Sequence, residues 1–113
     1  MGIKTPTDSI YRAAILTARD IDTDSGPTRA TAGVALAATL ERHGVHLTGA
    51  DTKGQNKPVP GILELDGGEG IVISVAGEER TTDWTAISRQ NRWRRVHLVH
   101  FAPRALSIKT VTV

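Results

Sequence analysis

At 113 residues, with 39% hydrophobic and 23% charged residues, the chain has the size and composition of one soluble globular domain spanning residues 1–113. The absence of cysteine excludes disulfide bonds, thiolate nucleophiles and cysteine-ligated zinc. No apolar run approaches the roughly 20 residues that cross a bilayer, and residues 1–8 lack the apolar core of a secretory signal. We therefore expect a cytoplasmic protein, or part of a virion, with no membrane partner.

Charge is distributed unevenly along the chain. After Asp83 there are six Lys and Arg residues and no acidic residue, so residues 84–113 carry +6 while residues 1–83 carry −4. Both tryptophans, Trp84 and Trp93, lie at the start of this basic stretch. Arginine outnumbers lysine ten to four, a bias that fits GC-rich coding and an actinobacterial or phage source. A cationic surface that carries aromatic rings suits an anionic partner.

Two helices are predicted in the first half of the chain. The Thr-Pro-Thr-Asp sequence at residues 5–8 supplies an N-cap, a proline at the first helical position and a capping-box acid. Apolar residues at three- and four-residue spacing then continue this helix to about residue 20. After a polar interruption, a second helix begins at Pro27 and ends at Gly44. The helical half, residues 5–44, is therefore expected to form a hairpin.

Residues 48–61 combine turn formers with polar residues and form the predicted surface loop that separates this half from a β-rich half, residues 61–113. The β-rich half contains four short runs of strand-forming residues. The first two are joined by an Asp-Gly-Gly-Glu turn and the last two by a turn around Pro103. The runs cover residues 61–65, 70–75, 95–101 and 106–113.

The predicted fold is α+β, with the N-terminal helical hairpin packed on a small antiparallel sheet of about four strands in meander order. In the last strand the apolar residues change phase between Ile108 and Val111. This change predicts either a β-bulge or a strand that is covered on both faces.

The main candidate site is an Arg/Trp cluster formed by Arg89, Arg92, Trp93, Arg94 and Arg95. Guanidinium groups bind phosphates, and an aromatic ring can stack on an unpaired base. We expect further contacts from three other basic residues, which are Arg104, Lys53 and Lys57. The competing interpretation is a solvated strand edge protected by charge, with the tryptophans in the core.

Local geometry decides how this cluster is presented. If residues 92–95 are extended, Arg92 and Arg94 share one face while Trp93 and Arg95 share the other. If residues 83–91 form a short helix capped by Asp83, then Trp84 and Ile87 pack inward and Arg89 faces solvent.

Other motifs do not reach the pattern that their chemistry requires. Residues 20–26 resemble the start of a calcium loop, but Ser25 and Thr31 occupy the positions of the essential glycine and glutamate. Residues 49–54 have P-loop glycine spacing without the Lys-Ser/Thr pair that follows it. The histidines occur as His43 with His46 and as His97 with His100, and on a strand the second pair would point to opposite faces. No metal site, cofactor site or catalytic group is predicted.

The expected function is non-enzymatic binding of an anionic partner, most favourably nucleic acid, through the basic Arg/Trp face. The alternative is a structural or assembly subunit of a homo-oligomer or phage particle. In that case the basic face would meet an acidic protein surface of a neighbour, such as residues 20–24 or 64–69, and the terminal strand would extend a neighbouring sheet. An enzyme ranks third, because no nucleophile with an adjacent base is apparent.

Overall fold

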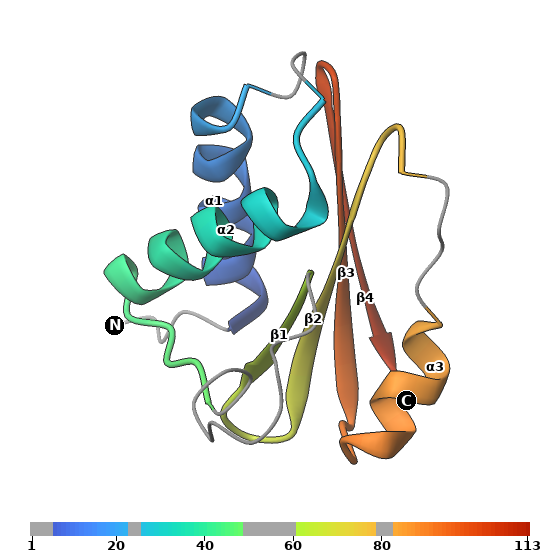
Figure 1. Ribbon diagram of the computed structural model, residues 1–113. Helices are drawn as coiled ribbons and strands as arrows, with labels where there is room; N and C mark the ends of the chain where they lie inside the picture. The colour runs from blue at the N-terminus through green and yellow to red at the C-terminus, as the bar shows by residue number, and fades with distance from the viewer. Residues whose placement is uncertain (1–5, 23–25, 49–60, 79–82) are drawn as a thin grey trace.

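The computed structural model describes residues 6–22, 26–48, 61–78 and 83–113. Two helices precede a β-hairpin, and a short third helix separates the second and third strands. Figure 1 shows α1 and α2 on one face of the sheet and α3 on the other. The α+β class, with a helical hairpin packed on a small sheet, is thus confirmed. The elements are α1 (Pro6–Asp20), α2 (Arg29–Arg42), β1 (Ile62–Leu65), β2 (Glu69–Val75), α3 (Trp84–Gln90), β3 (Arg95–Ala102) and β4 (Ala105–Thr112).

The two N-terminal helices follow the predicted pattern closely. In α1 a stripe that includes Ile10 and Ala14 is buried, as the three- and four-residue spacing predicts. The helix α2 begins after Thr28, whose hydroxyl accepts the backbone N–H of Thr31 at 3.1 Å, so it starts two residues later than the predicted Pro27 start. Gly44 follows the helix with φ of 78°, the left-handed conformation expected of a C-terminal glycine.

The sheet is mixed, which corrects the prediction of an antiparallel meander. Its strand order is β1-β2-β3-β4, and β1 with β2 and β3 with β4 are antiparallel pairs, but β2 and β3 run parallel. Parallel neighbours need a crossover connection. The helix α3 lies in that connection, on the face of the sheet opposite α1 and α2. The strand pattern alone does not reveal direction, because an alternating apolar sequence fits either type of pairing.

The strand β4 pairs with β3 in continuous register over residues 105–112, so it contains no bulge. Its apolar residues change phase because they serve different faces. Ile108 packs with the core beneath α1 and α2, whereas Val111 packs with the cluster beneath α3. Of the two explanations offered for the phase change, cover on both faces is the correct one.

Alternate residues of β2 and β3 form two apolar clusters, one on each face of the sheet. On the side of α1 and α2 the cluster includes Ile71, Ile73 and Val99 together with the buried stripes of both helices. On the opposite side a smaller cluster is formed by Val72, Val96 and Trp93, with Trp84 and Ile87 packed against it. This second cluster positions the α3–β3 segment that carries the arginines.

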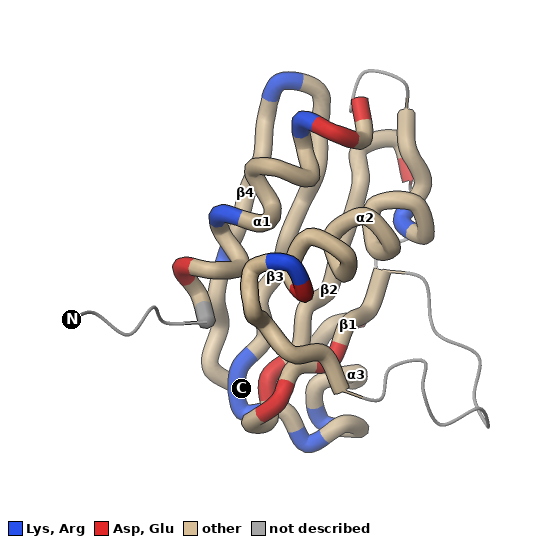
Figure 2. The backbone as a smooth tube through the Cα atoms, turned by 90° about the vertical axis from the view of Figure 1, so that its left-hand side faces the viewer, with Lys and Arg blue, Asp and Glu red and all other residues tan. Residues whose placement is uncertain are grey.

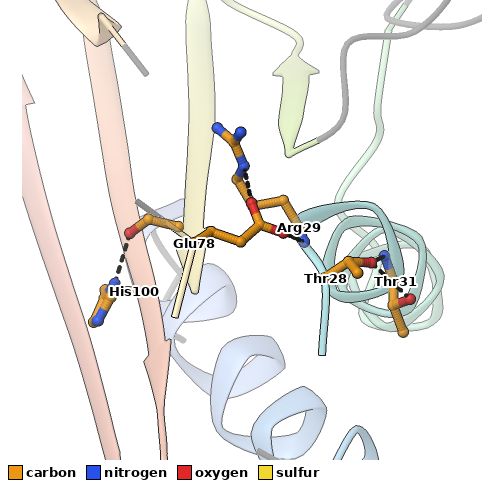
Figure 3. Close-up of polar contacts among 6 residues, drawn as sticks. Thr28, Arg29, Thr31, Glu78 and His100 are labelled. Carbon is orange, nitrogen blue, oxygen red and sulfur yellow. Dashed lines mark hydrogen bonds and ion pairs between the residues drawn. The ribbon is translucent and has the colours of Figure 1, made fainter. Parts of the chain in front are cut away.

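An ion pair connects the start of α2 to the turn that follows β2. The carboxylate of Glu78 accepts the backbone N–H of Arg29 at 2.9 Å and the Nε–H of the same residue at 2.5 Å. Figure 3 shows the two side chains facing each other beside the Thr28–Thr31 cap. A carboxylate at this place satisfies an N–H group in the first helical turn and interacts favourably with the helix dipole. These hydrogen bonds hold the pKa of Glu78 below its ordinary value of 4.5, although partial burial opposes the shift.

We expect Glu78→Gln to lower the free energy of unfolding at pH 7, and the difference from the parent protein to shrink as the solution is acidified. A carboxyl group whose pKa is lower in the folded state stabilises the protein above its unfolded pKa, and this contribution is lost as the pH falls through the folded pKa. Urea unfolding at pH 7 and pH 3 measures both effects. The control is Glu41→Gln on exposed α2 surface, and an equal loss in both variants would contradict the assignment.

Candidate anion-binding site

The segment from α3 to β3 is a tight turn held by backbone hydrogen bonds. Asp83 caps α3 by accepting the N–H of Ala86 at 3.1 Å, so the short capped helix that the sequence left open as one local geometry is present. After α3 the chain reverses at Arg92, which has a left-handed φ of 58°, and the N–H of Trp93 donates to the carbonyl of Ser88 at 2.9 Å. The turn therefore presents residues on either side of Trp93 to solvent while Trp93 itself turns inward.

Trp93 is a core residue in this structure and not a surface platform. Only 4% of it is exposed, and its indole N–H donates to the carboxylate of Glu64 at 3.1 Å. The ring lies directly over Gly70, where a Cβ atom would overlap three ring carbons, Cζ3, Cε3 and Cη2. The ring is therefore not accessible for stacking on a base, and the aromatic part of the predicted Arg/Trp cluster is withdrawn.

The four arginines of the cluster do not converge on one face. Arg89, Arg92 and Arg94 are exposed around the α3–β3 turn. Arg95 instead begins β3 on the face of α1 and α2, opposite Glu69 in the strand register. The left-handed turn at Arg92 breaks the alternation of an extended chain, so the extended geometry considered for residues 92–95 does not apply, and Trp93 and Arg95 lie on opposite faces.

The exposed arginines differ in whether their guanidinium groups already interact with other described residues. Arg94 donates from its guanidinium to the carbonyl of Gly67 at 3.0 Å, and Arg95 lies 3.9 Å from the carboxylate of Glu69. Within the described residues, the side chains of Arg89 and Arg92 form neither a hydrogen bond nor an ion pair. These two guanidinium groups can therefore bind a phosphate without first breaking an interaction with the part of the chain that is described.

The acidic residues of the β1–β2 turn lie beside this basic segment in the same molecule. Figure 2 shows Lys/Arg and Asp/Glu positions next to one another at the end of the protein that holds α3 and the C-terminus. Glu64 and Glu69 already accept hydrogen bonds from Trp93 and His97, respectively. Residues 64–69 therefore lie next to the basic segment within one chain.

Of the three remaining predicted basic residues, only Arg104 is among the described residues, and it does not join the α3–β3 turn. Arg104 lies in the β3–β4 turn, at the opposite end of β3, and the length of this eight-residue strand separates it from the α3–β3 turn by roughly 25 Å. Lys53 and Lys57 lie outside the described residues, as do residues 49–54 of the rejected P-loop pattern. The acidic turn of residues 20–26 is only partly described.

The histidines of β3 point to opposite faces, as predicted. On the face of the sheet that carries α3, Nδ1 of His100 lies 2.7 Å from the hydroxyl of Ser74. On the face of α1 and α2, His97 is fully buried between Glu69 and Thr110. The described residues include no group of three or more His, Asp or Glu residues that could hold a metal ion.

Sequence reasoning missed the Glu69–His97–Thr110 row. The three residues come from three strands, and their contact depends on the parallel pairing of β2 with β3, which was not predicted. The sequence did contain an indication of it. His97 lies among apolar residues of a predicted strand, and a polar residue at such a core position requires buried hydrogen-bond partners.

None of the described helices is long and apolar enough to cross a bilayer. Comparison of the chain with protein families, curated proteins and solved structures finds no match. The geometry of the described residues is thus the basis for assigning a function.

Proposed function

We propose that this protein binds an anionic partner, most favourably nucleic acid, through phosphate contacts made by Arg89, Arg92 and Arg94. The observation that carries the proposal is the exposure of Arg89, at the end of α3, and Arg92, in the hydrogen-bonded turn that follows, with no partner among the described residues for either guanidinium. Planar guanidinium groups donate two parallel hydrogen bonds to phosphate oxygens. Arg94 adds a third positive charge next to them.

The proposed contacts are to the backbone of the nucleic acid and not to its bases. Phosphate contacts position a protein on nucleic acid, whereas base contacts provide sequence specificity. Trp93 is enclosed, and the amide of Asn91 already donates to the carbonyl of Ile87 at 2.9 Å. We therefore expect binding that is weak, sequence-tolerant and strongly dependent on salt, with dissociation constants on the order of micromolar or weaker.

Fluorescence anisotropy with a labelled oligonucleotide tests the proposal at several salt concentrations. We expect Arg92→Ala with Arg94→Ala to weaken binding at low salt. The slope of log affinity against log salt concentration should become shallower by about one unit for each phosphate that the variant no longer neutralises. The proposal fails if this double variant binds as tightly as the parent protein at low salt.

The chain offers a matched control for the substitution of Arg92, whose backbone φ is positive. Arg104 is also exposed and also has a positive φ, 56° against 58° for Arg92, but it lies at the far end of β3. Arg92→Ala and Arg104→Ala therefore impose similar backbone strain and remove the same charge. We expect only Arg92→Ala to weaken binding, and equal effects would indicate a diffuse attraction to net charge.

A second candidate function is assembly into a homo-oligomer or particle. It is favoured by β4, which is an edge strand of the described sheet and extends over eight residues. The N–H of Val113 donates to the carbonyl of Arg94 at 2.9 Å, so Val113 is a residue that bonds to β3. In an antiparallel pair such residues alternate with residues whose N–H and C=O groups point away from the partner strand. Leu106, Ile108 and Thr110 are of this second kind, so their backbone groups face the free edge of β4. Such an edge can pair with another strand. Light scattering at high concentration tests this function, and a strict monomer would contradict it.

A further inference from the structure

Three side chains form a hydrogen-bonded row that runs from the surface of the edge strand β4 into the protein. The hydroxyl of Thr110, an exposed residue, lies 2.9 Å from Nδ1 of His97. The imidazole of His97 is fully buried, and its Nε2 lies 2.6 Å from Oε1 of Glu69. The side chain of Glu69 is 16% exposed, and its other oxygen lies 3.9 Å from the guanidinium of Arg95. The row therefore consists of the hydroxyl of an exposed threonine, an enclosed imidazole and a carboxylate.

With Glu69 ionised and His97 neutral, each hydrogen bond of the row has one possible direction. An ionised carboxylate only accepts hydrogen bonds, so Nε2 of His97 carries the proton that it donates to Glu69. In the neutral imidazole Nδ1 then has a free lone pair, and the Thr110 hydroxyl donates its proton to it. A hydroxyl held against an imidazole base that is oriented by a third group is the arrangement that activates an oxygen nucleophile.

We propose that Thr110 is an activated hydroxyl and a site of covalent acylation by activated acyl donors. In this step the Thr110 oxygen forms a bond to the acyl carbon and passes its proton to Nδ1 of His97. The bond from the acyl carbon to the leaving group breaks, and the leaving group departs with the electron pair. Glu69 acts as a positioning residue, because its carboxylate lies against the imidazolium that the step produces.

The enclosure of His97 limits the class of donor. The imidazole has no exposed surface from which to protonate a leaving group. Only donors whose leaving group departs as a stable anion, such as aryl esters, fit this constraint, whereas amides and alkyl esters do not. The same enclosure favours one lasting modification over repeated turnover, so the inference concerns a modification site and is compatible with the proposed binding function.

The same strand contains a matched internal control. Thr112 is also exposed and lies on the same face of β4 two residues further on, but its register partner on β3 is Arg95, not a histidine. Within the described residues its hydroxyl has no hydrogen-bond partner. The two threonines therefore share residue type, strand and exposure, and they differ in contact with an imidazole.

The test is treatment of the full chain with p-nitrophenyl acetate, followed by peptide mass mapping to measure acetylation at each threonine. We expect Thr110 to be acetylated about tenfold faster than Thr112 or more, since general base assistance typically contributes about 10²–10⁴-fold. Thr110→Val should abolish the label at that position, and Thr110→Ser, which removes a hindering methyl group, should retain it. Equal labelling of Thr110 and Thr112 in the parent protein overturns the proposal.

A second variant separates activation from simple accessibility. Glu69→Gln keeps a hydrogen-bond acceptor beside Nε2 but removes the negative charge that stabilises the imidazolium. We expect it to slow acetylation of Thr110 severalfold while leaving Thr112 unchanged. An unchanged Thr110 rate in folded Glu69→Gln, checked by circular dichroism, contradicts the proposed role of the row. If that variant does not fold, the Thr110 to Thr112 ratio in the parent protein decides the question.

Discussion

Replacing Trp93 with alanine is expected to lower the free energy of unfolding by about 3–5 kcal/mol, as is typical when a buried tryptophan is truncated. The indole is the largest member of the cluster beneath α3, where it packs with Val72 and Val96. Its loss leaves a cavity on that face and removes the N–H donor that Glu64 accepts. Because small proteins are stable by only about 5–15 kcal/mol, a loss of this size threatens the folded state.

Urea unfolding followed by circular dichroism measures this effect, and Trp93→Phe provides the milder comparison. Phenylalanine keeps an aromatic ring in the cluster and removes the hydrogen bond to Glu64, so we expect a smaller loss, of which about 1 kcal/mol is due to the hydrogen bond. The folded Trp93→Phe protein should bind an oligonucleotide as tightly as the parent protein. A large loss of binding with little loss of stability would instead indicate that Trp93 contacts the ligand.

Gly70→Ala is expected to destabilise the protein strongly, by about 1–3 kcal/mol and toward the upper end of the usual range for overpacking. A methyl group at position 70 would overlap the Trp93 ring, which lies flat against the backbone of β2. Either the ring or the strand must move, and β2 is hydrogen-bonded to strands on both sides. The glycine is therefore required by the close approach of a side chain.

A double-mutant cycle measures this dependence directly. Gly70→Ala should cost much less in a Trp93→Leu background, because the smaller side chain leaves room for the methyl group. Gly33→Ala is the control, since a Cβ at that helical position would meet its nearest atom at an ordinary 3.5 Å. It should be tolerated. Equal costs of Gly70→Ala in the two backgrounds would show that the indole is not the obstacle.

Local sequence patterns predicted most of the secondary structure correctly. The stripe in α1, Gly44 after α2 and the Asp83 cap of α3 depend on interactions within a few residues. Such interactions can be read from spacing and residue type. The direction of β3 relative to β2 was wrong, because strand direction depends on how the chain crosses the sheet and leaves no trace in the alternation of apolar residues.

The candidate site was predicted only in part. The concentration of arginines after Asp83 predicted a basic site in the α3–β3 segment. Arg89, Arg92 and Arg94 are exposed there. Whether they bind an anion stays a prediction. The position of Trp93 could not be inferred, because an aromatic residue between arginines suits both a surface platform and a core anchor. Gly70, which admits the ring, is 23 residues away in the sequence.

The sequence by itself determined which segments form helices and strands, which helix faces are apolar and where positive charge accumulates, because these properties depend on neighbouring residues. Only the tertiary structure decided which side chains meet across the sheet. It placed Trp93 over Gly70 and joined Glu69, His97 and Thr110 from three strands. The physical reason is that strand order, direction and register set those contacts, and they follow from packing the whole chain. The arginines of the basic stretch thereby differ: Arg89 and Arg92 have no partner in the described part of the chain, Arg94 and Arg95 are engaged, and Arg104 is distant.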